Sequence, residues 1–129
     1  MKEEAKRWIK FAVEDLKIAE LAMNEKIFNQ VCFHSQQCVE KLLKGCLLAM
    51  GKMYPKTHKL ADLMHALGES FFRDISENIV ALDRFYIPTR YPDALPGSLP
   101  DGIPSDGDAK EAIEVAREVL QRAKKIAGE

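Results

Sequence analysis

The densest cluster of polar and aromatic side chains lies between positions 83 and 93. An arginine beside an aromatic ring can pair with a phosphate while the ring stacks on a base. Guanidinium groups can equally bond the free carbonyls of a helix end, and the residues alone leave both interpretations open. The candidate binding residues of this cluster are Asp83, Arg84, Tyr86, Arg90, Tyr91 and Asp93.

A second polar set follows a helical period further upstream. Its members recur at steps of three and four residues, which places them on one face of a helix. The face changes from neutral to purely basic, and it leads into residues 41–59, which contain no Asp or Glu. Such a face can hold a phosphate or an acidic partner surface, and an ordinary solvated helix face is the alternative. The set consists of Gln30, His34, Gln37, Lys41 and Lys44.

Signatures of common enzymes are missing from the sequence. It contains no G-x-G-x-x-G, P-loop, H-E-x-x-H or G-x-S-x-G motif. His34, His58 and His65 lack the i, i+4 partners of a helical metal site, and we expect His58 and His65 to be structural or solvent-facing. We therefore predict no catalytic residue, metal or cofactor.

Composition indicates one globular domain. The 129 residues are 47% hydrophobic, and 19 Lys and Arg oppose 20 Asp and Glu, which excludes a uniformly basic nucleic-acid coat. Residues 1–59 carry 11 bases and 7 acids, whereas residues 60–129 carry 8 and 13. No apolar run is long enough to span a membrane and no signal peptide starts the chain, so we expect a cytoplasmic location. Cys32, Cys38 and Cys46 are expected to be free, packed thiols.

Helical periodicity predicts the elements that position these residues. Amphipathic patterns cover 2–24 and 28–50, and Gly51 ends the second helix. A short helix is expected from an N-cap at Thr57 to about Gly68, and a fourth helix over 72–87. A capping box at Ser105 and Asp108 begins the last helix, which ends near residue 127. The prediction is an all-α, antiparallel bundle of four to five helices, as a single domain over 1–129.

Residues 92–107 break the helical pattern. This stretch holds four of the six prolines, and Leu95, Leu99 and Ile103 each precede one of them. The spacing predicts an extended segment docked by apolar side chains rather than a free linker.

Three segments in order resemble the HEPN domain family. They are residues 33–44, with the pattern Q-Q-x-x-E-K-x-x-K, then His58-Lys59-Leu60, and then residues 86–93 with Arg90-Tyr91-Pro92. The alanine-rich pattern at 109–127 extends the resemblance to the whole chain. Cys38 stands where the family generally has a small residue such as alanine.

The resemblance implies a helical bundle that is usually a homodimer, association with nucleotide or RNA, and often a minimal nucleotidyltransferase as partner. Many members are ribonuclease toxins with an Arg that is followed, after four to six residues, by His. No arginine stands at that spacing before any of the three histidines. The R-Y-P branch of the family therefore indicates binding rather than cleavage.

These observations lead to three hypotheses. The first is a nucleotide- or RNA-binding module beside a nucleotidyltransferase in a toxin–antitoxin-type system: Arg90 contacts phosphate, Tyr91 or Tyr86 stacks on a base, Lys41 and Lys44 add charge, and Asp83 and Asp93 orient the arginines. The second is an unconventional ribonuclease toxin in which His34 moves the proton. The third is a protein-interaction module. A dimer is expected because Phe33, Leu43 and Leu47 lie outside the predicted inner stripe of their helix.

Overall fold

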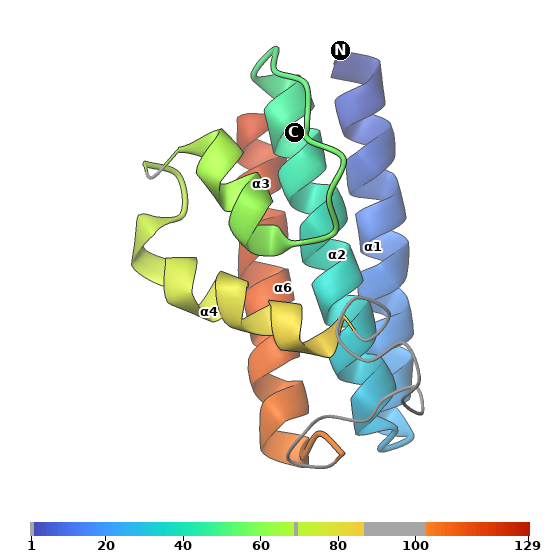
Figure 1. Cartoon of the computed structure of the whole chain (residues 1–129). Coiled ribbons are helices and arrows are strands. Elements are labelled where there is room, and N and C mark those ends of the chain that lie inside the picture. Colours follow the sequence, from blue (N-terminus) through green and yellow to red (C-terminus); the bar gives the residue numbers. More distant parts are fainter. Residues whose placement is uncertain (1, 69, 87–102) are drawn as a thin grey trace.

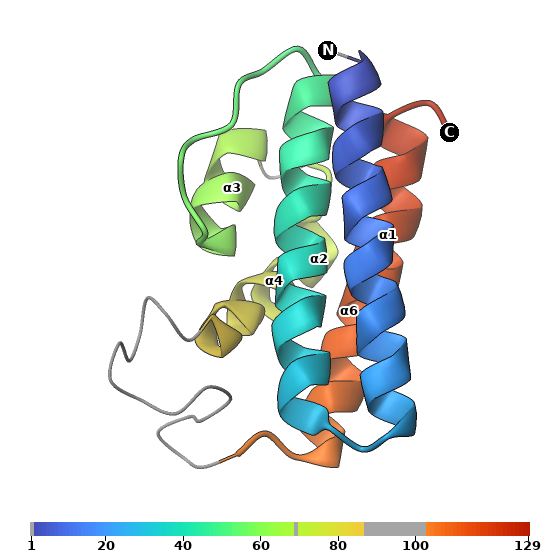
Figure 2. The same cartoon turned by 90° about the vertical axis from the view of Figure 1, so that its right-hand side faces the viewer.

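The computed structural model describes residues 2–68, 70–86 and 103–129. These residues form helices and no strand, which confirms the predicted all-α class. Three long helices stand side by side, and shorter helical elements cross one side of them (Figures 1 and 2). The long helices are α1 (Lys2–Asn24), α2 (Phe28–Ala49) and α6 (Asp106–Ile126); the shorter elements are α3 (Leu60–Leu67), α4 (Ser76–Ala81) and the 3₁₀ turns η1 (Arg73–Ile75) and η2 (Leu82–Phe85).

The long helices do not all alternate in direction. A tight turn joins α1 to α2, and Lys26 in it has a positive φ of 60°, so these two helices are antiparallel. The chain then crosses one side of the bundle through α3 and α4, and α6 returns in the same direction as α2 (Figure 2). A long crossover of this kind is what allows two neighbouring helices to run parallel.

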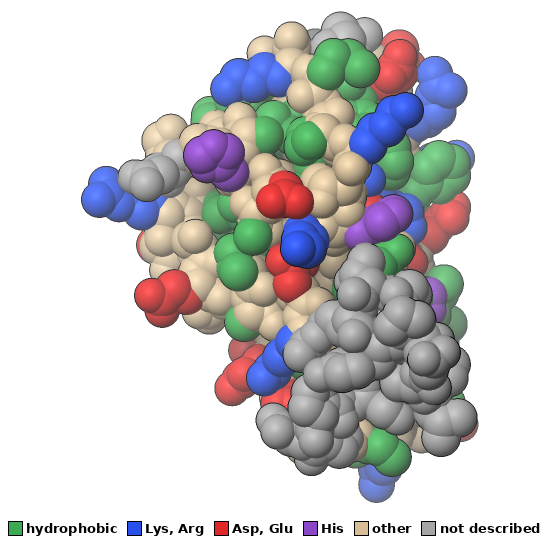
Figure 3. Space-filling model, in the orientation of Figure 1, with side chains coloured by type: hydrophobic (Ala, Val, Ile, Leu, Met, Phe, Trp, Pro, Cys, Tyr) green, Lys and Arg blue, Asp and Glu red, His purple; other side chains and the backbone are tan. Residues whose placement is uncertain are grey.

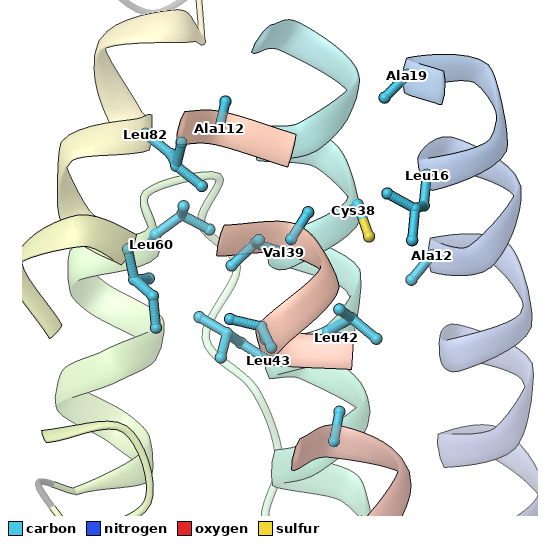
Figure 4. Close-up of a cluster of buried hydrophobic side chains, with 14 of the residues drawn as sticks. Ala12, Leu16, Ala19, Cys38, Val39, Leu42, Leu43, Leu60, Leu82 and Ala112 are labelled. Atoms are coloured by element: carbon cyan, nitrogen blue, oxygen red, sulfur yellow. The ribbon is translucent and has the colours of Figure 1, made fainter. Parts of the chain in front are cut away.

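The central element is α2, which contacts α1, α6, α3 and η2. Cys38 and Leu42 face α1, while Val39 and Leu43 face the opposite side (Figure 4). Leu43 and Leu47 are fully buried, so our expectation that they were free to form a dimer interface was wrong. They are needed inside, because the shorter elements cover the side of α2 that α1 leaves open.

The three cysteines are free and buried, as predicted. Burial raises the pKa of the Cys32, Cys38 and Cys46 thiols to about 12. They therefore stay protonated at neutral pH and act as small apolar core residues.

The start of α3 is capped from a distance. The backbone N–H groups of Leu60 and Ala61 donate to the two carboxylate oxygens of Asp83, at 2.8 and 3.2 Å. The N-cap residue is Lys59, not Thr57 as predicted, and its side chain makes no capping bond. Thr57 Oγ1 instead accepts from Lys59 N and donates to Asp62.

The helix predicted over 72–87 is three short consecutive elements instead, η1, α4 and η2. The buried residues Ile79, Leu82 and Phe85 recur every three positions. That spacing matches the three residues per turn of a 3₁₀ helix better than the 3.6 of an α-helix. The helix therefore changes from α to the narrower 3₁₀ form before it reaches Tyr86.

The capping box at the start of α6 is confirmed. Ser105 Oγ accepts from Asp108 N at 3.1 Å, and Asp108 Oδ2 accepts from Ser105 N at 3.0 Å. Just before it, Ile103 is 77% exposed and Pro104 is buried, so the docking expected of Ile103 is wrong. The remainder of that predicted docked segment, with Leu95 and Leu99, lies outside the described residues.

Gly45 lies where α1 and α2 approach closely. A Cβ atom at this position would lie 3.3 Å from the Ala5 carbonyl oxygen and 3.4 Å from Ile9 and Trp8. We expect Gly45→Val to lower the free energy of unfolding by about 1–3 kcal/mol, because the helices must separate to admit the side chain. Urea denaturation measures the change.

Gly107 is the control position. A Cβ atom there meets only Ser105 Oγ, at 3.7 Å. Gly107→Ala should leave stability unchanged or raise it slightly, since alanine favours the helix. Equal stability of wild type and Gly45→Val would contradict the close packing inferred for α1 and α2.

Candidate functional site

Two almost completely buried carboxylates bind the polar side chains of α2. Asp15 of α1 is 7% exposed and Glu40 of α2 is 5% exposed. Each one binds a lysine and a histidine. The prediction that the polar face of α2 becomes purely basic is therefore wrong, because each of its lysines is neutralised by a carboxylate.

Asp15 binds the first pair. Its Oδ1 lies 2.9 Å from His34 Nδ1, and Lys41 Nζ donates to Oδ2. Burial acts to raise the pKa of Asp15, but the hydrogen bonds and charges of His34 and Lys41 outweigh it and hold that pKa below its usual range. The His34 and Lys41 side chains are 21% and 26% exposed, so both reach the surface.

Glu40 binds the second pair. Its Oε2 accepts from Lys44 Nζ at 2.9 Å and lies 3.2 Å from His58 Nδ1. The Lys44 ammonium also lies over the rings of Trp8 and Tyr54, at 5.5 and 5.3 Å from their centroids. Lys44 is only 7% exposed, so it belongs to the interior of the network rather than to its open surface.

Two glutamines tie the loop after α2 to this network. Gln36 Nε2 donates to the backbone carbonyl of His58 at 3.1 Å, and Gln37 Nε2 donates to Gln36 Oε1 at 2.8 Å. Gln36 is fully buried. These bonds fix the position of His58, whose side chain is still 55% exposed.

The ring of Tyr86 joins the end of η2 to this surface. It stacks on the His58 ring with centroids 4.9 Å apart and planes at 13°, and it lies nearly parallel to Phe33 at 6.4 Å. Burial, with a contribution from the Glu40 charge, raises the pKa of Tyr86. Its phenol therefore stays protonated at neutral pH and can donate a hydrogen bond.

A hollow of about 560 Å³ opens beside the stacked rings. One of its lining residues, Arg84, pairs with Asp108 at 3.3 Å and lies over the Phe85 ring at 4.6 Å. Figure 3 shows histidine and cationic side chains on this side of the molecule. The hollow is lined by His58, Lys59, Val80, Ala81, Asp83, Arg84 and Tyr86.

The structure brings together part of the site predicted from the sequence. His34, Gln37 and Lys41 lie on the same surface of α2. Arg84 and Tyr86 both line the hollow, and Tyr86 also stacks on His58. Asp83 was expected to orient arginines, and its observed bonds go to the backbone of α3. Arg90, Tyr91 and Asp93 lie outside the described residues.

Sequence reasoning missed four participants. Asp15 gave no local signal, and Phe33, although it begins the quoted segment 33–44, was assigned to a dimer interface rather than to the site, because both roles depend on which residue faces them in space. Glu40 and His58 stood within the quoted motifs and could have been assigned to the site from them. In the described ranges, no group of three His, Cys, Asp or Glu side chains could hold a metal ion. No helix there is long and apolar enough to cross a membrane.

The fold defines a class of small helical-bundle proteins. Three long helices form the core, short elements cross it, and the central helix carries a polar network. The HEPN domain model matches residues 5–126, and the chain belongs to the HEPN family. The fold is similar to that of ST0689, described as an archaeal HEPN homologue, with 32% identity, a TM-score of 0.77 and coverage of 96% of this chain and 98% of the other.

Two further relatives extend the comparison. TT1696 from Thermus thermophilus is 31% identical, with a TM-score of 0.78 and coverage of 95% of this chain and 98% of the other. A Methanocaldococcus jannaschii protein named "Putative toxin MJ1304" is 28% identical over 127 residues, which cover 91% of this chain and 84% of that protein.

The Asp15 cluster predicts an acid-sensitive contribution to stability. Asp15→Asn leaves Lys41 and His34 without their counter-charge, and we expect it to lower the free energy of unfolding by about 1–3 kcal/mol at pH 7. The pKa of Asp15 is lowered on folding, so its contribution is present above about pH 4 and is lost as the pH falls through the folded value. The difference between variant and wild type should therefore shrink in acid.

Chemical denaturation at pH 7 and pH 3 measures both quantities. Glu14→Gln is the matched control, because Glu14 is the adjacent exposed carboxylate and makes no ion pair among the described residues. A deficit for Asp15→Asn that stays constant with pH would show that the ionised carboxylate is not its source.

Proposed function

We propose that this HEPN domain is a toxin-like module that binds a nucleotide or RNA and acts with a nucleotidyltransferase partner. The observation that carries the proposal is the stack of Tyr86 on His58 beside a hollow lined by Lys59 and Arg84. A base can extend such a stack, since every base has a π face, while neighbouring cations pair with its phosphate.

The charge balance supports cations outside α2 as the phosphate ligands. Lys41 and Lys44 each face a nearly buried carboxylate, so they add little net positive field. Arg84 pairs with Asp108, and the two side chains are 44% and 33% exposed. An exposed ion pair of this kind is weak and can exchange for a phosphate. Arg90 and Tyr91, which follow Tyr86 in the sequence, extend the proposed site, with Asp93 to orient the arginine.

The proposed partners come from family membership and from the relative's name. A toxin-named homologue supports a toxin–antitoxin-type system in which a minimal nucleotidyltransferase is the second component. A homodimer is proposed on the same ground. Of the three residues expected at its interface, only Phe33 is not buried within the chain.

The binding proposal predicts that Arg90→Ala and His58→Ala both weaken binding of fluorescent ATP or of a short single-stranded RNA. We expect a loss of about tenfold for each variant, because one removes a phosphate contact and the other removes a stacking face. Fluorescence anisotropy measures the affinity, and circular dichroism checks that the helices are intact.

Arg117→Ala is the matched control, since Arg117 pairs with Glu20 on another surface. It removes the same charge and should bind like wild type. Wild-type protein that binds neither ligand would overturn the proposed function. Binding that survives Arg90→Ala would remove Arg90 from the site.

A second candidate function, ribonuclease activity, rests on the His34–Asp15 pair. The carboxylate at Nδ1 orients the imidazole, which leaves Nε2 to exchange a proton with the RNA. In that case wild-type protein should cleave single-stranded RNA and His34→Ala should not, as followed on denaturing gels. His65→Ala is the control, because His65 is an exposed histidine of α3. RNA left intact by wild type excludes this candidate.

A further inference from the structure

A second hollow lies away from the α2 network, where α4 and η2 meet α6. Its volume is about 760 Å³. Figure 1 shows α4 crossing α6 steeply, and the residues that line the hollow come from both helices and from η2, so we refer to it as the corner between α4, η2 and α6. It shares Ala81 and Arg84 with the proposed nucleotide site and otherwise has its own residues.

The floor of this corner is apolar. Leu82, Phe85 and Ala112 form its buried base. Ile75 and Val115 are half-buried above them, and Ala81 is exposed. Filling a recess of this composition with an apolar side chain is favourable, because apolar surface on both partners is removed from water.

The rim of the corner is acidic. Glu77 of α4 stands on one side, and Glu111 and Glu114 of α6 stand on the other, all three exposed. None of the three makes an ion pair with a described residue, whereas Asp108 pairs with Arg84 and Glu118 pairs with Arg122.

We propose that the corner between α4, η2 and α6 docks a basic, amphipathic segment of a protein partner. Apolar side chains of that segment fill the recess over Val115 and Ile75, and its Lys or Arg side chains pair with Glu77, Glu111 and Glu114. Charge complementarity selects this occupant, because an acidic segment would be repelled by the rim and a neutral apolar one would leave its carboxylates uncompensated. A nucleic acid is disfavoured at this surface for the same reason.

The dimensions suit one face of a short helix. Glu111, Glu114 and Glu118 follow steps of three and four along α6, and they span about two turns, or roughly 10 Å. An amphipathic helix presents apolar side chains at the same spacing. The inference does not depend on nucleotide binding, since none of the residues altered below lines the stack of Tyr86 and His58.

The test uses a fluorescein-labelled amphipathic peptide of Leu and Lys, together with its counterpart in which Glu replaces each Lys. The 129-residue protein should bind the basic peptide and not the acidic one, as measured by anisotropy at low salt. The Glu111→Lys/Glu114→Lys variant should weaken binding by about tenfold or more, because two attractions become repulsions. Val115→Ser should also weaken it, through the lost apolar contact.

The control is Glu14→Lys/Glu25→Lys, which changes the net charge by the same amount at two exposed carboxylates elsewhere. It should keep the wild-type affinity for the basic peptide to within about twofold. Equal losses in the two double variants would show attraction to overall charge and would overturn the proposal. So would wild-type protein that fails to bind the basic peptide.

Discussion

The burial of α2 is the constraint on which the rest of the structure depends. This helix is covered by α1, α6 and the shorter elements, yet it carries Gln36, Glu40 and Lys44, all of them nearly or fully buried. A buried charge without a partner costs several kcal/mol, so each one must be matched by a group from α2 itself or from a neighbouring element. That requirement places Lys44 and His58 against Glu40, and it likewise pairs the buried Asp15 of α1 with His34 and Lys41 of α2.

The same constraint determines what the site can do. Because Glu40 and Asp15 neutralise the lysines of α2, this face has little net charge and is rigidly bonded. Gln36 donates a hydrogen bond to the backbone carbonyl of His58, and Glu40 contacts the His58 ring. The ring of Tyr86 in turn stacks against His58. The network therefore positions the stacked rings, while the cations that can exchange partners lie at its edge.

Charge is divided between two adjoining surfaces. The rings of His58 and Tyr86 and the side chain of Lys59 lie on one side of Arg84, and the rim glutamates of α4 and α6 lie on the other. Arg84 lines both hollows and pairs with Asp108, whose pKa is lowered chiefly by its hydrogen bonds with Ser105 at the start of α6. A partner protein and an anionic ligand can thus occupy neighbouring places without competing for the same charges.

The sequence by itself determined the class of fold, the long helices and their ends. Periodicity in 2–24 and 28–50 and the capping box at Ser105 are local signals, and local hydrogen bonds and side-chain spacing are enough to read them. The motif around Glu40, Lys41 and Lys44 likewise indicated the family.

Only the tertiary structure decided which residue faces which. Asp83 caps α3 from 22 and 23 residues away, and Asp15 reaches His34 and Lys41 across a helix pair. Such contacts depend on the rotation and separation of packed helices, which periodicity does not specify. The same holds for Leu43 and Leu47: an apolar residue outside the first stripe is free or buried according to how many neighbours surround its helix, and α2 is covered on nearly every side.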